Sequence, residues 1–237
     1  MPTTLDIAFA IGFTTAIIAA EFLYFDTRLK AQIAAGISRA RRAAYGYLTL
    51  GEWAITATAV LLWARVHRPW NILGLVPPQD WHLVAGILIA ALVMALTIRQ
   101  LRAVQRLGTK QRAVLRGRLD AAEFFLPHVP AERRWFLVLS LTAGFCEELL
   151  YRGFLTWLVA SYAGLPAAIG VVTVVFALSH AAQGRSGMIK VGLVGLTMSL
   201  IVVLTGWLVP AMIVHALIDI GAGDLGFAVY YDRPLPA

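Results

Sequence analysis

Long apolar runs and short polar segments alternate along almost the whole chain. A helix of roughly 20 apolar residues crosses a hydrocarbon core about 30 Å thick, and each run approaches or exceeds that length. We therefore predict an all-α fold, a polytopic transmembrane helix bundle of about seven spans, with six or eight also compatible. Pro210 is the only break between the last two runs and predicts a tight turn there. The runs are residues 5–25, 45–64, 81–98, 135–160, 167–183, 187–208 and 211–231.

The composition agrees with a membrane protein. Hydrophobic residues make up 59% of the 237 residues and charged residues 14%, whereas soluble domains carry about a quarter charged residues. The first run lacks a basic segment before it and a cleavage site after it, so we expect a retained helix rather than a signal peptide. No internal repeat or linker divides the chain. We predict a single domain, with N-terminal helices and a basic loop in residues 1–133 and the helices that carry polar motifs in residues 134–231.

The formal net charge of +7 comes from basic residues that gather between apolar runs. They lack a nucleic-acid recognition pattern, so no nucleic-acid partner is expected. Lys and Arg are retained on the cytoplasmic side of a membrane, and here they concentrate in residues 28–42 and 99–134. We predict a multi-pass protein of the plasma (inner) membrane, with the N-terminus outside and the C-terminus, with Arg233, in the cytoplasm. Basic and apolar residues also alternate within 101–118, which suits an amphipathic helix on an anionic leaflet.

Ionisable residues inside predicted spans are the candidates for chemistry, because they are costly in a membrane. Glu147, Glu148 and Arg152 lie in the fourth run. On a helix, Glu148 and Arg152 are one turn apart and can pair, whereas Glu147 is rotated by about 100° and points elsewhere. A glutamate without an arginine partner is suited to act as a general base that activates water. A structural ion-pair cluster is the alternative interpretation of these three residues.

Two further spans carry histidines. His180 follows Phe176 by one helical turn in the fifth run, and Asp219 follows His215 by one turn in the last. A lone buried histidine is more often a packing residue, but Asp219 is placed to orient His215 or to add a ligand. At 1.5 Å per residue, all three polar groups fall near the middle of a bilayer, so we expect them to meet in one cavity.

This set of residues suits hydrolysis. A carboxylate and an imidazole can hold a water, and further donors can stabilise an oxyanion. The same set is also compatible with a divalent metal such as zinc, because two histidines and a carboxylate with an open position form a catalytic pattern. The candidate metal ligands are Glu147, His180, His215 and Asp219. Both the metal-free and the metal-dependent mechanism remain open at this point.

The three motifs resemble those of the CPBP intramembrane proteases, the family of type II CAAX prenyl endopeptidases and Abi-like bacterial relatives. The resemblance covers roughly the last hundred residues and is carried by Glu147-Glu148 with Arg152, Phe176 with His180, and His215 with Asp219. It implies an intramembrane endopeptidase acting on a membrane-anchored protein or peptide. Glu147 and His180 would activate the water, His215 and Asp219 would stabilise the oxyanion, and Glu148 and Arg152 would support them. Asp219 departs from the family, which typically has asparagine there, and an ionised aspartate cannot donate a hydrogen bond.

Other features of the sequence suggest rival interpretations. Gly221-Ala222-Gly223-Asp224 spells the GxGD signature of intramembrane aspartyl proteases, but the preceding run has no second aspartate. Cys146 is the only cysteine, which excludes an intrachain disulfide, and a buried thiol is usually inert. A proton-coupled transporter would use similar residues, but the chain has no inverted repeat. A non-catalytic immunity or scaffold protein on the same fold is the remaining alternative.

Overall fold

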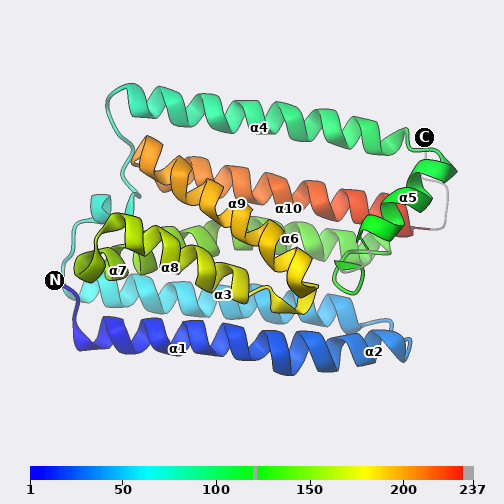
Figure 1. The fold of residues 1–237 in the computed structure, drawn as a ribbon, viewed down its shortest axis with the longest axis horizontal. Helices are drawn as coiled ribbons and strands as arrows, with labels where there is room; N and C mark the ends of the chain where they lie inside the picture. Colours follow the sequence, from blue (N-terminus) through cyan, green and yellow to red (C-terminus); the bar gives the residue numbers. More distant parts are fainter. Residues whose placement is uncertain (120–121, 232–237) are drawn as a thin grey trace.

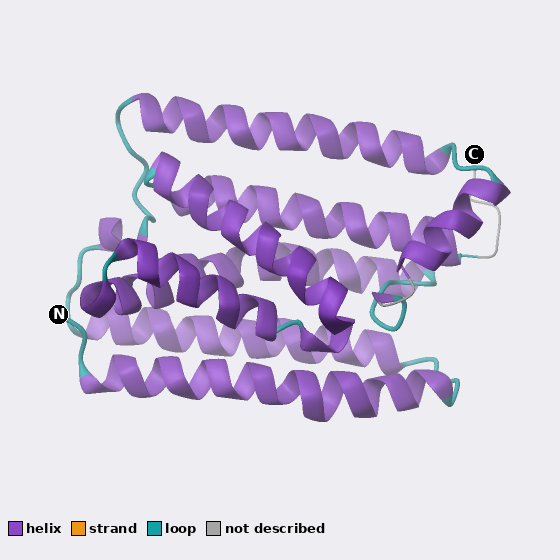
Figure 2. Cartoon of the chain, viewed as in Figure 1, coloured by secondary structure: helices purple, strands orange, loops and turns teal. Residues whose placement is uncertain are grey.

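The computed structural model describes residues 1–119 and 122–231, and every regular element within them is a helix. Long helices run side by side along the longest axis of the molecule (Figure 1) and are joined by short loops (Figure 2). The predicted all-α bundle is therefore confirmed. Arg233 and the rest of residues 232–237 lie outside the described part of the chain.

Three helical rods form the N-terminal half. The first consists of α1 (Thr4–Ala20), the π-helical segment η1 (Glu21–Leu29) and α2 (Lys30–Ala34) in direct succession. The second is α3 (Ala40–Arg65), and the third is α4 (Trp81–Gln105). A short 3-10 turn, η2 (Trp70–Leu73), lies between α3 and α4, and Asp80 caps α4 by accepting a hydrogen bond from the backbone N–H of His82. All three rods are long and apolar enough to cross a membrane.

The second half contains four more helical segments. α6 (Pro130–Glu147), the π-helical η4 (Glu148–Leu155) and α7 (Thr156–Ala163) follow one another without a break. The shorter α8 (Leu165–Leu178) comes next, then the 3-10 turn η5 (Ala181–Gln183) with α9 (Gly184–Thr205), and finally α10 (Leu208–Tyr230). Five helices in the described residues meet the length and hydropathy of a span. With the α6–η4–α7 rod and α8, they correspond to the seven predicted runs of a multi-pass integral membrane protein.

Two helix boundaries in the structure differ from those predicted from the sequence. The run 167–183 was expected to be helical throughout, but α8 ends at Leu178, and His180 lies in the turn before η5. Ser179 favours this ending because its hydroxyl donates to the Phe176 carbonyl at 2.8 Å. The turn expected at Pro210 instead lies at Gly206, whose φ of 60° ends α9. Pro210 is inside the first turn of α10, where proline costs no helical hydrogen bond.

α10 is packed between α4, α6 and α9, and it carries the last polar motif into the middle of the bundle. A small residue allows its closest approach to α6. A Cβ atom added at Gly144 would lie 2.8 Å from both Ala216 Cβ and the Met212 carbonyl oxygen. Without that atom the two helix backbones come together as small-residue membrane contacts do. This contact sets the distance between the Glu147-Glu148 pair on one helix and His215 on the other.

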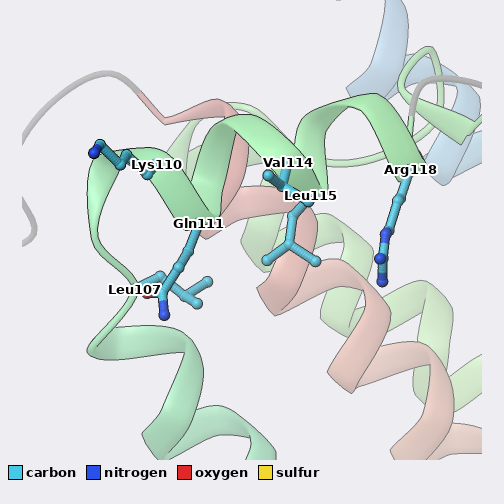
Figure 3. A pocket seen from close by; sticks show the side chains of 6 residues that line it. All are labelled: Leu107, Lys110, Gln111, Val114, Leu115 and Arg118. Carbon is cyan, nitrogen blue, oxygen red and sulfur yellow. The ribbon is translucent and has the colours of Figure 1, made fainter.

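The two basic segments lie at the same end of the bundle, opposite the N-terminus (Figure 1). One joins α2 to α3, and the other contains α5 (Thr109–Leu119). The basic alternating segment 101–118 is divided between the end of α4 at Gln105 and α5, rather than forming one helix. Arg116 of α5 donates to the Val229 carbonyl near the end of α10 at 2.7 Å. Figure 3 shows a pocket on α5 that no candidate site residue lines; its lining residues are Leu107, Lys110, Gln111, Val114, Leu115 and Arg118. The cytoplasmic placement of this end stays a prediction.

Candidate active site

His215 of α10 is the centre of the polar cluster. Its Nδ1 lies 2.8 Å from Glu148 Oε1, and its Nε2 lies 3.7 Å from Glu147 Oε2. Asp219, one turn later on the same helix, places Oδ2 3.6 Å from Nε2. An ionised carboxylate only accepts hydrogen bonds, so the Nδ1 of His215 donates to Glu148. Nε2 is thereby left facing Glu147 and Asp219.

Glu148 and Arg152 form the ion pair that their spacing predicts. Arg152 Nη1 donates to Glu148 Oε1 at 2.9 Å, and the two side chains are 1% and 0% exposed. The Arg152 guanidinium also lies 4.1 Å over the ring of Phe176. Glu148 Oε1 thus accepts from both Arg152 and His215, so the buried charge is paired, whereas Glu148 Oε2 has no hydrogen-bond partner among the described residues.

A glycine that the sequence analysis did not single out makes room for this arrangement. A Cβ atom added at Gly195 of α9 would lie 2.7 Å from Arg152 Nη2 and 2.8 Å from Phe176 Cδ1. Its only sequence signal is a glycine within an apolar helix, which in membranes often marks a close contact. Gly195 lets the arginine and the aromatic ring stack beneath α9.

The two glutamates share His215 as a partner, but only Glu148 also pairs with Arg152, as their spacing predicts. Glu147 ends α6 and Glu148 begins the π-helical η4, whose wider turn has i→i+5 hydrogen bonds. In the structure, both carboxylates lie against His215, one at each ring nitrogen. π-bulges of this kind are frequent at functional sites.

His180 is held by the end of α8. Its Nδ1 lies 3.0 Å from the Phe176 carbonyl oxygen, and a carbonyl only accepts, so Nδ1 carries the hydrogen. In the neutral ring, Nε2 is then the acceptor. The Phe176 ring separates the two histidines, with centroid distances of 5.0 Å to His180 and 6.1 Å to His215. In the described part of the chain, the ion-pair partner of Glu147 is His215 rather than His180.

The candidate metal ligands can be tested against this geometry. The Nε2 atom of His215 lies near the carboxylates of Glu147 and Asp219, and its Nδ1 atom is hydrogen-bonded to Glu148. Within residues 1–119 and 122–231, no group of three or more His, Cys, Asp or Glu side chains is arranged to hold a metal ion. These side chains as placed therefore do not form a metal site.

Two acidic residues of the N-terminal half also approach the site. Glu52 of α3 interacts electrostatically with Glu147 and Asp219, and among the described residues its buried Oε2 has no hydrogen-bond partner. Glu21, at the start of η1, accepts a hydrogen bond from the turn that follows His180. Sequence reasoning gave neither residue a role. The available signal was an acidic residue within an apolar run, which marks functional positions in membrane helices.

The residues of the GxGD sequence and Cys146 are held in contacts with neighbouring helices. Asp224 of the GxGD sequence contacts the Arg133 guanidinium at the start of α6. The glycines beside it lie at helix contacts, because a Cβ atom at Gly223 would overlap the Phe136 ring and one at Gly221 would lie 3.3 Å from the Gln100 side chain. Cys146 is fully buried. Their placement is that of packing residues.

The fold and the site together define a multi-pass membrane bundle with a buried cluster of carboxylates, imidazoles and a guanidinium. Residues 130–221 match the family described as type II CAAX prenyl endopeptidase Rce1-like. The match runs from α6 into α10, includes all six candidate site residues, and confirms the resemblance found in the sequence motifs. It supports an intramembrane protease of the CAAX type. No curated protein and no solved structure matches the chain.

Proposed function

We propose that the protein is an intramembrane endopeptidase that hydrolyses a peptide bond in a membrane-associated protein or peptide, using water activated by Glu147. The observation that carries the proposal is the pair of consecutive glutamates on the two ring nitrogens of one histidine, inside an apolar bundle. A structural ion pair needs only one of these carboxylates, and Arg152 already pairs with Glu148. The second carboxylate is then available for chemistry.

Exposure separates the roles of the two glutamates. The Glu148 side chain is 0% exposed, whereas that of Glu147 is 18% exposed and that of Asp219 is 34% exposed. Glu147 can therefore meet a water and a substrate carbonyl, which a general base must do. Glu148 is enclosed and holds His215 and Arg152 in place. His180, with Nε2 as its acceptor, is the second group suited to hold the water.

The hydrolysis can be written with these groups alone. Glu147 takes a proton from water as the water oxygen attacks the carbonyl carbon, and the carbonyl oxygen becomes an oxyanion. His215, protonated against Glu148, donates from Nε2 to that oxyanion. Glu147 then returns the proton to the leaving nitrogen, the C–N bond breaks, and a carboxylic acid and an amine are released, which become a carboxylate and an ammonium when the acid proton passes to the amine. Asp219 orients His215 from the same helix rather than donating to the oxyanion, since an ionised aspartate has no proton to give.

The test compares the wild type with Glu147→Gln in native membranes. Membrane-anchored peptides that are cleaved would be identified by mass spectrometry, with and without a chelator. Glu123→Gln is the matched control, because Glu123 is partly exposed and lies in the loop before α6, outside the site. Cleavage that is lost only in Glu147→Gln and survives chelation supports the proposal, whereas loss on chelation assigns a metal to the reaction. Identical profiles for wild type and Glu147→Gln reject the enzyme and leave the scaffold or transporter interpretation.

A further inference from the structure

Two side chains of the first helical rod, those of Glu21 and Lys30, form hydrogen bonds with the backbone of Ala182. Glu21 Oε2 accepts a hydrogen bond from the Ala182 N–H at 2.9 Å, and Lys30 Nζ donates to the Ala182 carbonyl at 2.9 Å. Ala182 is 4% exposed and lies in η5, outside the long helices. Buried backbone groups at such a place need partners, and here both come from a segment more than 150 residues earlier in the chain.

The π-helical segment η1 is what allows both contacts. Nine residues separate Glu21 from Lys30, which in an α-helix would place them about 180° apart on opposite faces. η1 spans Glu21–Leu29, and its wider turns rotate the chain less per residue. The two side chains consequently reach the same residue on one side of the rod. A regular α-helix over these positions would direct one of them away from η5.

Lys30 is anchored by further contacts. Its ammonium forms an ion pair with Asp26 at 2.6 Å and lies 4.7 Å over the ring of Phe124. The Lys30 side chain is 37% exposed, so the ion pair alone would contribute little to stability. The contact with the Ala182 carbonyl is more buried. The geometry thus favours a role for Lys30 in fixing η5 rather than in stabilising its own helix.

Ala182 is two residues beyond His180 in the 3-10 turn η5, where the Gln183 N–H donates to the His180 carbonyl at 3.1 Å. From the other side, His180 is tied to α8 by its Nδ1 contact with the Phe176 carbonyl. The turn that carries the imidazole is therefore held at one end by α8 and at the other by Glu21 and Lys30. Displacing a reacting group by about 1 Å can cost roughly 100-fold in rate.

We propose that Glu21 and Lys30 are positioning residues that set the place of His180 through the backbone of Ala182. They lie outside residues 130–221, so the N-terminal rod completes a site that the family-matched segment does not build alone. The rate effect rests on the proposed function of that site. The effect of Glu21 and Lys30 on the position of the His180 imidazole does not depend on the proposed function, and it can be measured without any substrate.

The first measurement is the rate at which diethylpyrocarbonate modifies His180 in the purified full-length protein, with the exposed His67 as the internal reference. Glu21→Leu and Lys30→Met each remove one contact, Glu21→Gln and Lys30→Arg each keep one, and Arg28→Met is the control on an exposed cation of the same rod. We expect modification of His180 to change several-fold in the first pair and to stay at the wild-type value in the others. Unchanged modification in both Glu21→Leu and Lys30→Met would overturn the proposal. Elution as a single species in detergent verifies that each variant is folded.

The second measurement is steady-state cleavage of a peptide taken from the wild-type profile. Loss of either contact should lower kcat by about 10- to 100-fold and leave KM within about twofold, with Glu21→Gln and Lys30→Arg recovering most of kcat. A change in His180 modification without a change in kcat would overturn the positioning role. If the wild type cleaves no peptide, the proposed function fails, while the modification rates still decide whether these residues place His180.

Discussion

The carboxylate of Glu148 and the imidazole of His215 form a buried hydrogen bond of 2.8 Å that joins η4 to α10. Glu148 also accepts from Arg152, so one carboxylate orders both a guanidinium and an imidazole. The bond fixes which nitrogen of His215 faces the rest of the site. It depends on the close approach of α6 and α10 at Gly144, since a larger residue there would separate the two helices.

Removing the charge of Glu148 should destabilise the protein as well as impair cleavage. Glu148→Leu would leave Arg152 buried without its partner, and breaking a buried pair in this way costs about 3–5 kcal/mol. Unfolding of the purified protein in mixed micelles measures this loss. The double variant Glu148→Leu with Arg152→Met should recover much of the stability without recovering cleavage. A single variant as stable as the wild type would contradict the structural role assigned to this pair.

Asp219→Asn should retain cleavage. The amide can still contact His215, and it adds N–H donors that an oxyanion can use. Asp219→Leu removes the contact that orients His215 and should lower kcat by about 100-fold, because misplacing a reacting group by about 1 Å costs that much in rate. The pair of variants is compared on one peptide substrate under identical conditions. Loss of cleavage in Asp219→Asn would mean that the negative charge itself is required.

Gly195→Ala should disturb the site without touching a polar group. The added methyl would meet Arg152 Nη2 and the Phe176 ring at less than 3 Å, and overpacking typically costs about 1–3 kcal/mol. Gly170→Ala is the matched control, because a Cβ atom at that position of α8 meets nothing within 4 Å. Unfolding in mixed micelles should separate the two variants. Equal stability of both would show that the contact with α9 can relax freely.

The orientation of the bundle can be checked by cysteine labelling. In a Cys146→Ser background, Ser38→Cys lies in the basic loop between α2 and α3, and Gln79→Cys lies in the loop before α4. Because basic loops stay in the cytoplasm, a membrane-impermeant maleimide should label Gln79→Cys in intact cells and Ser38→Cys only after permeabilisation. The reverse labelling pattern would place the N-terminus in the cytoplasm.

The sequence by itself determined the number of helical runs and which residues belong to the candidate site. Runs of apolar residues predict spans because a helix in lipid must satisfy its backbone hydrogen bonds within itself and present apolar side chains to the lipid. Both requirements are local. The pairing of Glu148 with Arg152 is also local, since it follows from a spacing of four residues. The three motifs identified the residues that the structure brings around His215 and Phe176.

Only the tertiary structure decided how these residues face one another. The π-helical turns at η1 and η4, the end of α8 before His180, and the shared use of His215 by two glutamates depend on contacts between distant segments. Gly195 and the Glu21–Lys30 contacts with Ala182 have the same origin. Hydrophobic periodicity reports which residues avoid water, and in a membrane nearly every helix face does so. The pattern therefore cannot distinguish a face that meets lipid from one that meets another helix, and helix packing makes that distinction.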